Sequence, residues 1–494
     1  MARSSRGLMP PLELNRSSRA PLFRQIERGL REAILSGRLP AGTRIPSTRS
    51  LAVSFDVSRT TVLLAFDQLL ARGLLEATPG GGTYVVDQLP QEVRSRDPDG
   101  AVAPTRPAST RGAALLDAPA LPTDANSETR TFALALSAAR DFPLDAWARA
   151  QAEGRRALAQ GSGEGLGPAG HLRLRTAVAR LLRIARGVVC DPDQVVVVSG
   201  VQEALYLVGT LLLDPGEAFW HGDPGHRGHR SVLEVVGGRP VAVPHDEHGF
   251  DVDFGRRHAP DARMAVLSPL GAFPVGLATA PARRTALLEW AREADAFVFE
   301  DDWDPASYLF QPAAPALASQ DPDGRVIYTA GLSRAFSTVV RMTFLVLPKA
   351  LAPSVISVRR RQQLLGLIEG QPPLLDQLTI ADFLEGGHLE AMAGQRAERS
   401  RARHTALMEA LRAGLGPDAS LGTGDGMTYG VIWLPEGTDD RALAGRLAGE
   451  GLESLPATAL WAEGNGRPGL VLGSAAFPEE TIRSDVRRLV ALLD

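Results

Sequence analysis

The sequence predicts a multidomain chain. A small α+β winged helix-turn-helix precedes a larger α/β domain with a mostly parallel sheet and a smaller C-terminal α/β subdomain. Three observations predict this fold class. The chain has 494 residues, which is too long for one core at ~150 residues per domain. Residues 44–86 hold two short helical patterns and a glycine-rich hairpin. From about residue 131, apolar strands alternate with helical segments, as in parallel sheets.

Charge is divided unevenly along the chain. Residues 1–87 carry 12 Arg and 7 Asp or Glu, a net charge of +5, whereas the remainder carries −9. A basic N-terminal segment on an acidic body is typical of a chain that contacts DNA through that segment. The apolar runs are shorter than the roughly 20 residues that span a bilayer, and the N-terminus lacks the apolar region of a secretory signal. We therefore expect a cytoplasmic protein with no membrane partner.

Cysteine usage excludes one class of site. Cys190 is the only cysteine, so the sequence offers neither a disulfide framework nor a cysteine-based metal site. We expect no metal, and we interpret Cys190 as a small, buried hydrophobic side chain.

The N-terminal domain is predicted over residues 15–87. Apolar residues at helical spacing between residues 22 and 34 predict a first helix that Gly37 ends. Ser47 and Ser58 are good N-caps for two further helices. Residues 74–77 and 83–86 can pair as strands across a Pro-Gly-Gly-Gly turn, which forms the wing.

This arrangement predicts a DNA-reading surface. The first turns of the third helix would enter the major groove, where Arg59 can pair with guanine and threonine can contact phosphate or a thymine methyl. Arg44 and Arg49 flank the preceding helix, where phosphates would lie. The alternative is a helical hairpin with surface arginines. The predicted DNA-binding residues are Arg44, Ser47, Arg49, Ser58, Arg59, Thr60, Thr61, Gly81, Gly82 and Thr83.

Residues 88–130 are rich in Pro, Ala, Asp and Arg without periodicity, which indicates an interdomain linker. Residues 131–494 form the predicted body, with buried strands near 194–198, 263–267, 296–299 and 326–329. From about residue 353 to the end, helices alternate with strands near 427–434 and 469–472. We interpret that region as the smaller subdomain.

Few segments of the body contain residues that could bind a ligand or take part in a reaction. The run Ser199-Gly200-Val201-Gln202 lies between a strand and a helix N-terminus, a natural phosphate seat. Residues 300–304 cluster carboxylates after a strand, where ligands bind in open α/β folds. The alternative for that cluster is a solvated acidic turn. Ser333, Arg334 and Arg341 follow the next strand and could hold an anion.

With these motifs in view, the N-terminal domain closely resembles the GntR family of winged helix-turn-helix repressors. The matching segments are 21–26, 39–52, 57–62 and 82–85, which include Leu-Pro-Ala-Gly-Thr-Arg-Ile-Pro-Ser-Thr-Arg and Val-Ser-Arg-Thr-Thr-Val. The resemblance implies phosphate and base contacts by Arg49, Arg59, Thr60 and the wing glycines. Double-stranded operator DNA is the implied partner.

The body resembles a fold-type I aminotransferase, and the whole chain resembles the MocR subfamily of GntR regulators. Segments that carry this resemblance include Leu-Asp-Pro-Gly at 213–216, Asp-Pro-Gly at 223–225, Phe-Pro at 273–274 and Glu-Asp-Asp at 300–302. The resemblance implies a homodimer that binds pyridoxal phosphate through a lysine aldimine and responds to the cofactor or to an amino compound.

The sequence departs from this pattern where the chemistry would occur. The position of the Schiff-base lysine holds Arg334, and the only lysine, Lys349, follows the next strand. Trp303 stands in place of the tyrosine expected after the paired aspartates, and His226 is the aromatic residue after Asp-Pro-Gly. A guanidinium group stays protonated and is not an amine nucleophile, so no aldimine forms there. The remaining cofactor-binding residues would be Gly200, Gln202, Asp301, Ser333 and Arg341.

Three hypotheses remain open from the sequence. The first is a transcription regulator whose body is catalytically inactive and either senses a ligand or dimerises. The second is a regulator that still binds pyridoxal phosphate non-covalently, or as an imine with an amine ligand. The third is a working transaminase tethered to DNA, which the missing lysine argues against.

Overall fold

The chain forms two compact units, residues 1–107 and 108–494. The computed structural model describes residues 14–16, 20–78, 82–86, 109, 130–134, 142–161, 166–302, 315–331, 340–366, 370–422, 427–464 and 466–493. In that part of the chain, no helix is long and apolar enough to cross a membrane.

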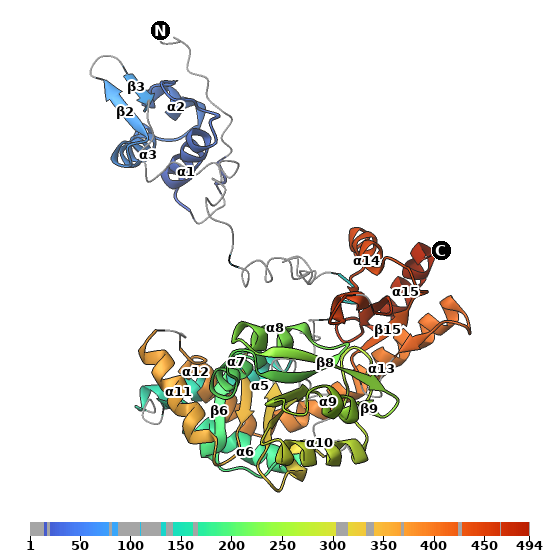
Figure 1. Cartoon of the computed structure of the whole chain (residues 1–494). Helices are drawn as coiled ribbons and strands as arrows, with labels where there is room; N and C mark the ends of the chain where they lie inside the picture. The colour runs from blue at the N-terminus through green and yellow to red at the C-terminus, as the bar shows by residue number, and fades with distance from the viewer. Residues whose placement is uncertain are drawn as a thin grey trace. The chain divides into compact units, whose positions relative to one another are not determined.

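In the described residues, the N-terminal unit has three helices and a small antiparallel sheet of order β1-β3-β2 (Figure 1). Its elements are α1 (Leu22–Leu35), β1 (Arg44–Ile45), α2 (Thr48–Ser54), α3 (Arg59–Ala71), β2 (Leu75–Thr78) and β3 (Gly82–Val85). Ile26, Leu30, Val62 and Phe66 are buried in one core between α1 and α3. The predicted helices and wing strands are therefore present, and β1 adds a strand that the sequence did not predict.

The second unit is built on an eight-stranded sheet of order β6-β13-β12-β11-β10-β7-β8-β9. Its strands are β6 (Val195–Val198), β7 (Ala218–Asp223), β8 (Arg239–Asp246), β9 (Gly249–Phe250), β10 (Met264–Leu267), β11 (Phe297–Asp302), β12 (Val326–Gly331) and β13 (Thr343–Val346). The pairs β7–β8, β7–β10, β10–β11 and β11–β12 are parallel. Strand β13 is antiparallel to both β12 and β6, so β6 runs in the same direction as the parallel strands. The predicted, largely parallel sheet is confirmed.

Helices cover both faces of this sheet (Figure 1). They are α5 (Leu144–Ala159), α6 (Leu172–Arg186), α7 (Val201–Leu212), α8 (Arg227–Val235), α9 (Val252–His258), α10 (Pro281–Glu293), α11 (Ala352–Leu364) and α12 (Leu374–Glu385). Short elements complete the layer: the β4 (Leu166–Gly167) and β5 (Gly170–His171) hairpin, η4 (Pro192–Gln194) and η6 (Leu317–Gln320).

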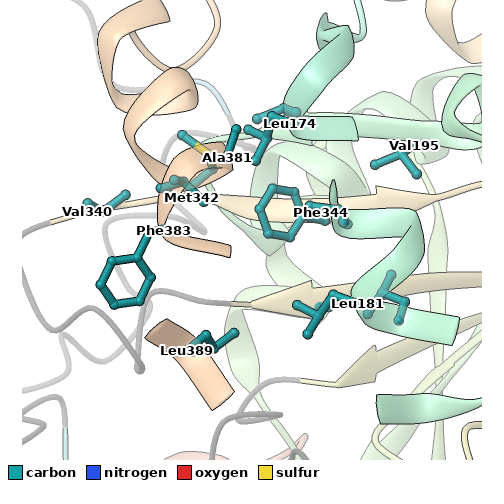
Figure 2. Packing of buried hydrophobic residues seen from close by; sticks show 14 of the residues in the cluster. Leu174, Leu181, Val195, Val340, Met342, Phe344, Ala381, Phe383 and Leu389 are labelled. Atoms are coloured by element: carbon teal, nitrogen blue, oxygen red, sulfur yellow. The ribbon is translucent and has the colours of Figure 1, made fainter. Parts of the chain in front are cut away.

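Strand β6 shows why the sheet is buried on both sides. Its four valines are all inaccessible to solvent. Val195 and Val197 pack into one hydrophobic cluster, and Val196 and Val198 pack into another on the opposite face. Figure 2 shows the first cluster, where Leu174 and Leu181 of α6 lie near Phe344 of β13 and Phe383 of α12. A continuous β-branched run is what a doubly covered strand requires.

The C-terminal subdomain has its own antiparallel sheet of order β14-β15-β17-β16. Its elements are α13 (His388–Leu415), β14 (Leu421–Gly422), β15 (Tyr429–Trp433), α14 (Asp440–Gly449), β16 (Leu455–Pro456), η8 (Ala457–Leu460), β17 (Gly469–Gly473) and α15 (Glu479–Leu493). The sequence placed the start of this subdomain at about residue 353. In the structure, residues of α11 and α12 pack in the clusters of the large sheet instead.

Residues 131–133 belong to this subdomain although they are distant from it in sequence. Thr131 forms an isolated parallel bridge with Leu452. The amide of Gly473 donates to the Phe132 carbonyl oxygen at 2.7 Å, and Phe132 is buried among α13–α15 residues. The chain therefore enters the body through its C-terminal subdomain.

Candidate nucleic-acid interface and candidate ligand pocket

Two serines cap the helices of the predicted DNA-reading motif. Ser47 Oγ accepts a hydrogen bond from the Ser50 amide at 3.1 Å at the start of α2. Ser58 Oγ accepts from the Thr61 amide at 3.1 Å at the start of α3, and it also lies 2.8 Å from Thr61 Oγ1. The Ser58 and Thr61 hydroxyls, which the sequence assigned to DNA contact, therefore also serve to begin the recognition helix.

The Arg44 side chain lies close to Gly82, the first residue of β3. A Cβ atom on Gly82 would lie 3.1 Å from Arg44 Nε, and Gly82 has a φ of +110°. Only glycine adopts this conformation at low cost while leaving room for the guanidinium. Arg44 is exposed, so its charge can meet a phosphate beside the wing.

The other predicted DNA-binding arginines are also exposed. Arg49 lies on α2, and Arg59 Nε lies 3.4 Å from Thr48 Oγ1 across the α2–α3 turn. Thr60 is exposed beside Arg59, whereas Thr61 and Thr83 are half-buried. Gly81 lies outside the described residues. The described residues of the predicted DNA-binding set therefore all lie in the N-terminal unit. Its exposed arginines Arg44, Arg49 and Arg59 lie on β1, α2 and α3.

In the body, a cavity of about 40 Å³ opens where parallel strands end. It is lined by His221, Gly222, Pro224, Gly225, His226, His229, His245, Val266, Leu267, Ser268, Ala272 and Phe273. These residues come from β7, β8 and β10 and from the segments that follow them. The carboxyl edge of an open α/β sheet is where ligands bind in such folds.

Asp301 is buried beside this cavity, with 4% of its surface exposed. Its Oδ1 accepts a hydrogen bond from Thr329 Oγ1 at 3.1 Å. Its Oδ2 lies 3.1 Å from Nε2 of His229 on α8, a close contact without the alignment of a hydrogen bond. The structure therefore holds the carboxylate that the sequence singled out between a hydroxyl and an imidazole.

His229 and His226 form a stacked pair of imidazole rings. The two ring centroids lie 4.5 Å apart. A Cβ atom on Gly228 would lie 2.9 Å from His226 Cε1 and 3.1 Å from Gln202 Nε2. Gln202 and His226 therefore both lie beside Gly228, and His226 stacks on the histidine that contacts Asp301.

Two further histidines border the cavity in an uncharged form. Burial lowers the pKa of His221 to about 4, and burial likewise lowers the pKa of His245 to about 4. His221 Nδ1 lies 3.1 Å from the Gly222 carbonyl oxygen. A Cβ atom on Gly222 would lie only 2.4 Å from His245 Cε1, so glycine is required for the His245 ring to occupy this place.

Glu300 and Asp302 do not form the solvated acidic turn that the sequence left open. Both lie within β11, with 1% and 4% exposed surface. Glu300 accepts hydrogen bonds from the Leu317 and Ala318 amides, each at 2.8 Å. Asp302 Oδ2 accepts from Arg186 Nε at 2.9 Å and from the Tyr328 hydroxyl at 2.6 Å.

Because side chains alternate along a strand, these two carboxylates point away from the face that carries Asp301. Burial, together with the nearby Asp302 carboxylate, raises the pKa of Glu300 to about 7, although the two amide donors act to lower it. Glu300 and Asp302 therefore belong to the packing beneath the cavity and not to its lining.

The predicted phosphate seat lies at the N-terminus of α7. Gly200 caps this helix in extended backbone, and Gln202 is exposed in its first turn. One amide is already used, because the Ser199 N–H donates to Glu203 Oε2 at 2.7 Å. Glu203 also pairs with the fully buried Arg359 at 2.8 Å.

The only lysine lies far from this cavity along the sheet. Strand β13 is antiparallel to β12, with Val346 opposite Tyr328 and Thr343 opposite Gly331. Lys349 follows the end of β13 and is therefore at the edge opposite to Asp301. Its side chain is 83% exposed and lies 3.2 Å from Asp191. Arg341 is exposed before β13, on the Asp301 edge, whereas Ser333, Arg334 and Trp303 lie outside the described residues.

These residues fit the ring of pyridoxal phosphate and do not fit its covalent attachment. A buried carboxylate can accept a hydrogen bond from a pyridinium N–H, and the flat imidazole of His226 can stack on a ring. No described residue at this edge supplies an amine.

Sequence reasoning missed His229 and Thr329, which hold Asp301. A signal for His229 was available, since His226 and His229 are spaced i, i+3 at the start of a helix and must share a face. No signal in the sequence pointed to Thr329. Among the described residues, no cluster of His, Cys, Asp or Glu has the geometry of a metal site.

Known proteins resemble both units of the chain. Residues 22–85 match the bacterial regulatory proteins of the gntR family, and residues 131–420 match aminotransferase class I and II. The probable rhizopine catabolism regulatory protein MocR of Rhizobium meliloti is 31% identical over 97% of this chain and 95% of its own length. The pyridoxine biosynthesis regulator PdxR of Corynebacterium glutamicum is 28% identical over 96% of each chain. The kynurenine aminotransferase structure of Pyrococcus horikoshii, at 21% identity, covers 79% of this chain and 95% of its own with a TM-score of 0.67, which shows the fold.

Proposed function

This chain belongs to the MocR type of GntR-family transcription regulators, in which a DNA-binding module precedes an aminotransferase-like domain, and we propose that its body forms no lysine aldimine. The body instead senses a small ligand without covalent attachment, or serves as the dimerisation unit of the DNA-bound regulator. The observation that carries this proposal is the position of the single lysine.

The geometry of Lys349 supports the proposal directly. Imine formation requires an amine next to the ring that Asp301 would hold. Lys349 is exposed, is paired with Asp191, and follows a strand that ends at the opposite edge of the sheet. Arg334 occupies the position where the family carries its lysine, and its guanidinium remains protonated at any relevant pH.

The surroundings of Asp301 favour a second candidate function, a regulator that binds pyridoxal phosphate non-covalently. Thr329 and His229 hold the Asp301 carboxylate in place, and His226 lies over His229 at the cavity. A pyridine ring could donate a hydrogen bond from its nitrogen to this carboxylate and stack on the flat ring of His226. Either vitamer, the aldehyde or the amine, could then act as the effector.

Absorption spectroscopy with a restoring variant tests the main proposal. Purified full-length protein mixed with pyridoxal phosphate should give no visible aldimine band, and borohydride should leave its intact mass unchanged. The Arg334→Lys variant should gain both signals if the remaining pocket is preserved. The Lys349→Met variant identifies any surface labelling. A wild-type protein that turns yellow, is bleached by borohydride and loses both signals in Lys349→Met and in Asp301→Ala would overturn the proposal, because Lys349 is the only lysine. Loss in Lys349→Met alone would indicate labelling of the surface.

Titration calorimetry separates the candidates. Heat with either vitamer, lost in Asp301→Ala, supports the non-covalent sensor. No heat with either vitamer leaves the body as a sensor of another ligand or as a dimerisation unit. Amino-group exchange by the pure protein that disappears in Asp301→Ala would instead revive the transaminase hypothesis.

We also propose that the regulator acts as a homodimer on a two-fold symmetric operator, because operator symmetry normally mirrors protein symmetry. Sedimentation of the protein alone and with a selected duplex measures both stoichiometries. A monomer that binds one half-site would contradict this assignment.

A further inference from the structure

The recognition helix α3 exposes two leucines on the side that faces away from its own core. Leu63 and Leu64 are 39% and 47% exposed. The apolar residues of the opposite face, Val62, Ala65 and Phe66, are at most 3% exposed. Isolated exposed leucines are common on protein surfaces. A function for these two must therefore be argued from their position on α3.

Both leucines follow the predicted base-contacting residues by one helical turn. Leu63 lies four positions after Arg59, and Leu64 lies four positions after Thr60. Residues at this spacing share a face, and helical side chains lean toward the N-terminus of their helix. The two isobutyl groups therefore cover the surface next to Arg59 and Thr60, which is the part of α3 that enters the major groove.

The major groove offers one apolar group that matches this surface. Among the four bases only thymine displays a methyl group there, at C5, and apolar side chains contact it. The groove is roughly 12 Å wide and admits a helix, so side chains one turn along α3 remain within reach of base edges.

The positive charge around Leu63 and Leu64 indicates which kind of partner binds over them. Arg44, Arg49 and Arg59 are exposed around the same helix-turn-helix, and Arg59 reaches the N-terminus of α2. A surface edged with arginines fits a polyanion better than the acidic body of this chain. We propose that Leu63 and Leu64 read thymine methyl groups in each operator half-site and are specificity-determining residues of this regulator. This inference rests on the DNA-binding function of the module.

The test compares thymine with uracil, which differs only by the missing methyl group. A preferred duplex is first obtained by in vitro selection with the full-length protein. Each thymine is then replaced by uracil, and affinity is measured by fluorescence anisotropy at fixed salt. Uracil at one or two thymines per half-site should weaken binding about three- to five-fold, as expected for one lost methyl contact.

Variants identify the residues that read the methyl groups. Leu63→Ala or Leu64→Ala should bind the thymine duplex less tightly and no longer distinguish thymine from uracil at the same position, as in a double-mutant cycle. Their affinity for the uracil duplex should match that of the wild type, which also shows that the module is folded. Val53→Ala, which alters an 80% exposed apolar residue of α2, is the matched control and should keep the discrimination.

Equal affinity for thymine and uracil at every position would overturn the inference. So would full discrimination in both leucine variants, which would point to Thr60 or to another group. Failure to enrich any duplex is a different outcome, because it would overturn DNA recognition itself. An effect of Leu63→Ala or Leu64→Ala on dimer formation instead of on thymine preference would assign these leucines to a protein contact.

Discussion

The Nε2 atom of His229 lies 3.1 Å from Oδ2 of Asp301, and both side chains are buried where β11 and α8 meet. The other carboxylate oxygen accepts a hydrogen bond from Thr329. Both oxygens of Asp301 are thus positioned by this chain. The carboxylate is oriented to accept a hydrogen bond from a donor in the cavity. Rotation of the Asp301 side chain would break the hydrogen bond from Thr329.

Asp301→Asn should weaken non-covalent binding of pyridoxal phosphate about ten-fold or more, because hydrogen bonds to a charged group contribute ~1.5–3 kcal/mol. Equilibrium dialysis with the phosphate ester measures the effect. Asp193→Asn is the matched control, since that carboxylate is 92% exposed and precedes β6 at the opposite edge. If both variants bind pyridoxal phosphate as tightly as the wild type, Asp301 does not contact this ligand.

The sequence predicted the carboxylate and strands β6, β10, β11 and β12 of the large sheet, and it failed where local pattern does not carry the information. Strands β7 and β8 were missed because β7 ends in Trp-His-Gly-Asp and β8 contains Pro240 and Pro244, which oppose a strand assignment. The contact between His229 and Asp301 joins residues 72 positions apart. It depends on the strand order of the sheet, which no local periodicity encodes.

Gly82→Ala should reduce operator affinity because its Cβ would lie 3.1 Å from Arg44 Nε and displace that side chain. The substitution also places alanine at a φ of +110°, which costs about 1 kcal/mol or more of stability. Gly37→Ala is the control, since Gly37 has a φ of +73° and no neighbour within 4 Å of its added Cβ. Thermal unfolding should show a loss in both variants, and anisotropy should show weaker DNA binding in Gly82→Ala alone. Equal DNA affinities would exclude the Arg44 explanation.

Arg359→Leu should destabilise the body by about 3 kcal/mol or more, because it leaves the Glu203 carboxylate without its buried partner. Arg359 is fully buried and donates to the Val197 carbonyl oxygen at 2.6 Å as well as to Glu203. Lys349→Met breaks an exposed pair with Asp191 and should change stability by less than ~1 kcal/mol. Urea unfolding of both variants compares the two pairs, and similar losses would mean that burial does not govern their strength.

The body should lose stability as the pH falls below about 6.5, in part because of His221 and His245. Burial lowers the pKa of each to about 4, whereas an unfolded histidine titrates near ~6.5. Between these values the unfolded chain binds the proton and the folded chain does not, so stability is present above the window and declines through it.

His221→Leu or His245→Leu should reduce that acid-induced loss between pH 7 and pH 5 by up to about 2 kcal/mol each. Unfolding free energies at both pH values measure the difference. His248→Leu, which replaces an exposed histidine, is the control substitution. A variant at His221 or His245 with the full wild-type loss would show that the buried ring is not the group that titrates.

Four hydrogen bonds connect the segment that carries His226 to the C-terminal subdomain. Gly225 N donates to the Leu460 carbonyl oxygen at 3.1 Å, and Ala462 N donates to Asp223 Oδ1 at 2.8 Å. Arg227 Nη1 donates to the Ala459 carbonyl oxygen at 3.1 Å, and Arg230 Nη1 to that of Ala462 at 2.8 Å. The same subdomain holds residues 131–133 through the amides of Glu453 and Gly473. It is therefore in contact with both the cavity and the entry of the chain into the body.

Loosening one of these two contacts should leave the other intact, because separate hydrogen bonds hold each of them. Arg227→Met combined with Arg230→Met should speed hydrogen exchange at the Gly225 and Ala462 amides, by about five-fold per lost bond, while the Gly473 amide keeps its protection. Gly473→Ala should do the reverse, because its Cβ would lie 2.6 Å from the Ala133 carbonyl oxygen. Gly445→Ala, with no neighbour within 4 Å, is the control. Exchange that rises together at both contacts in either variant would show that the subdomain opens as a whole and transmits disorder between them.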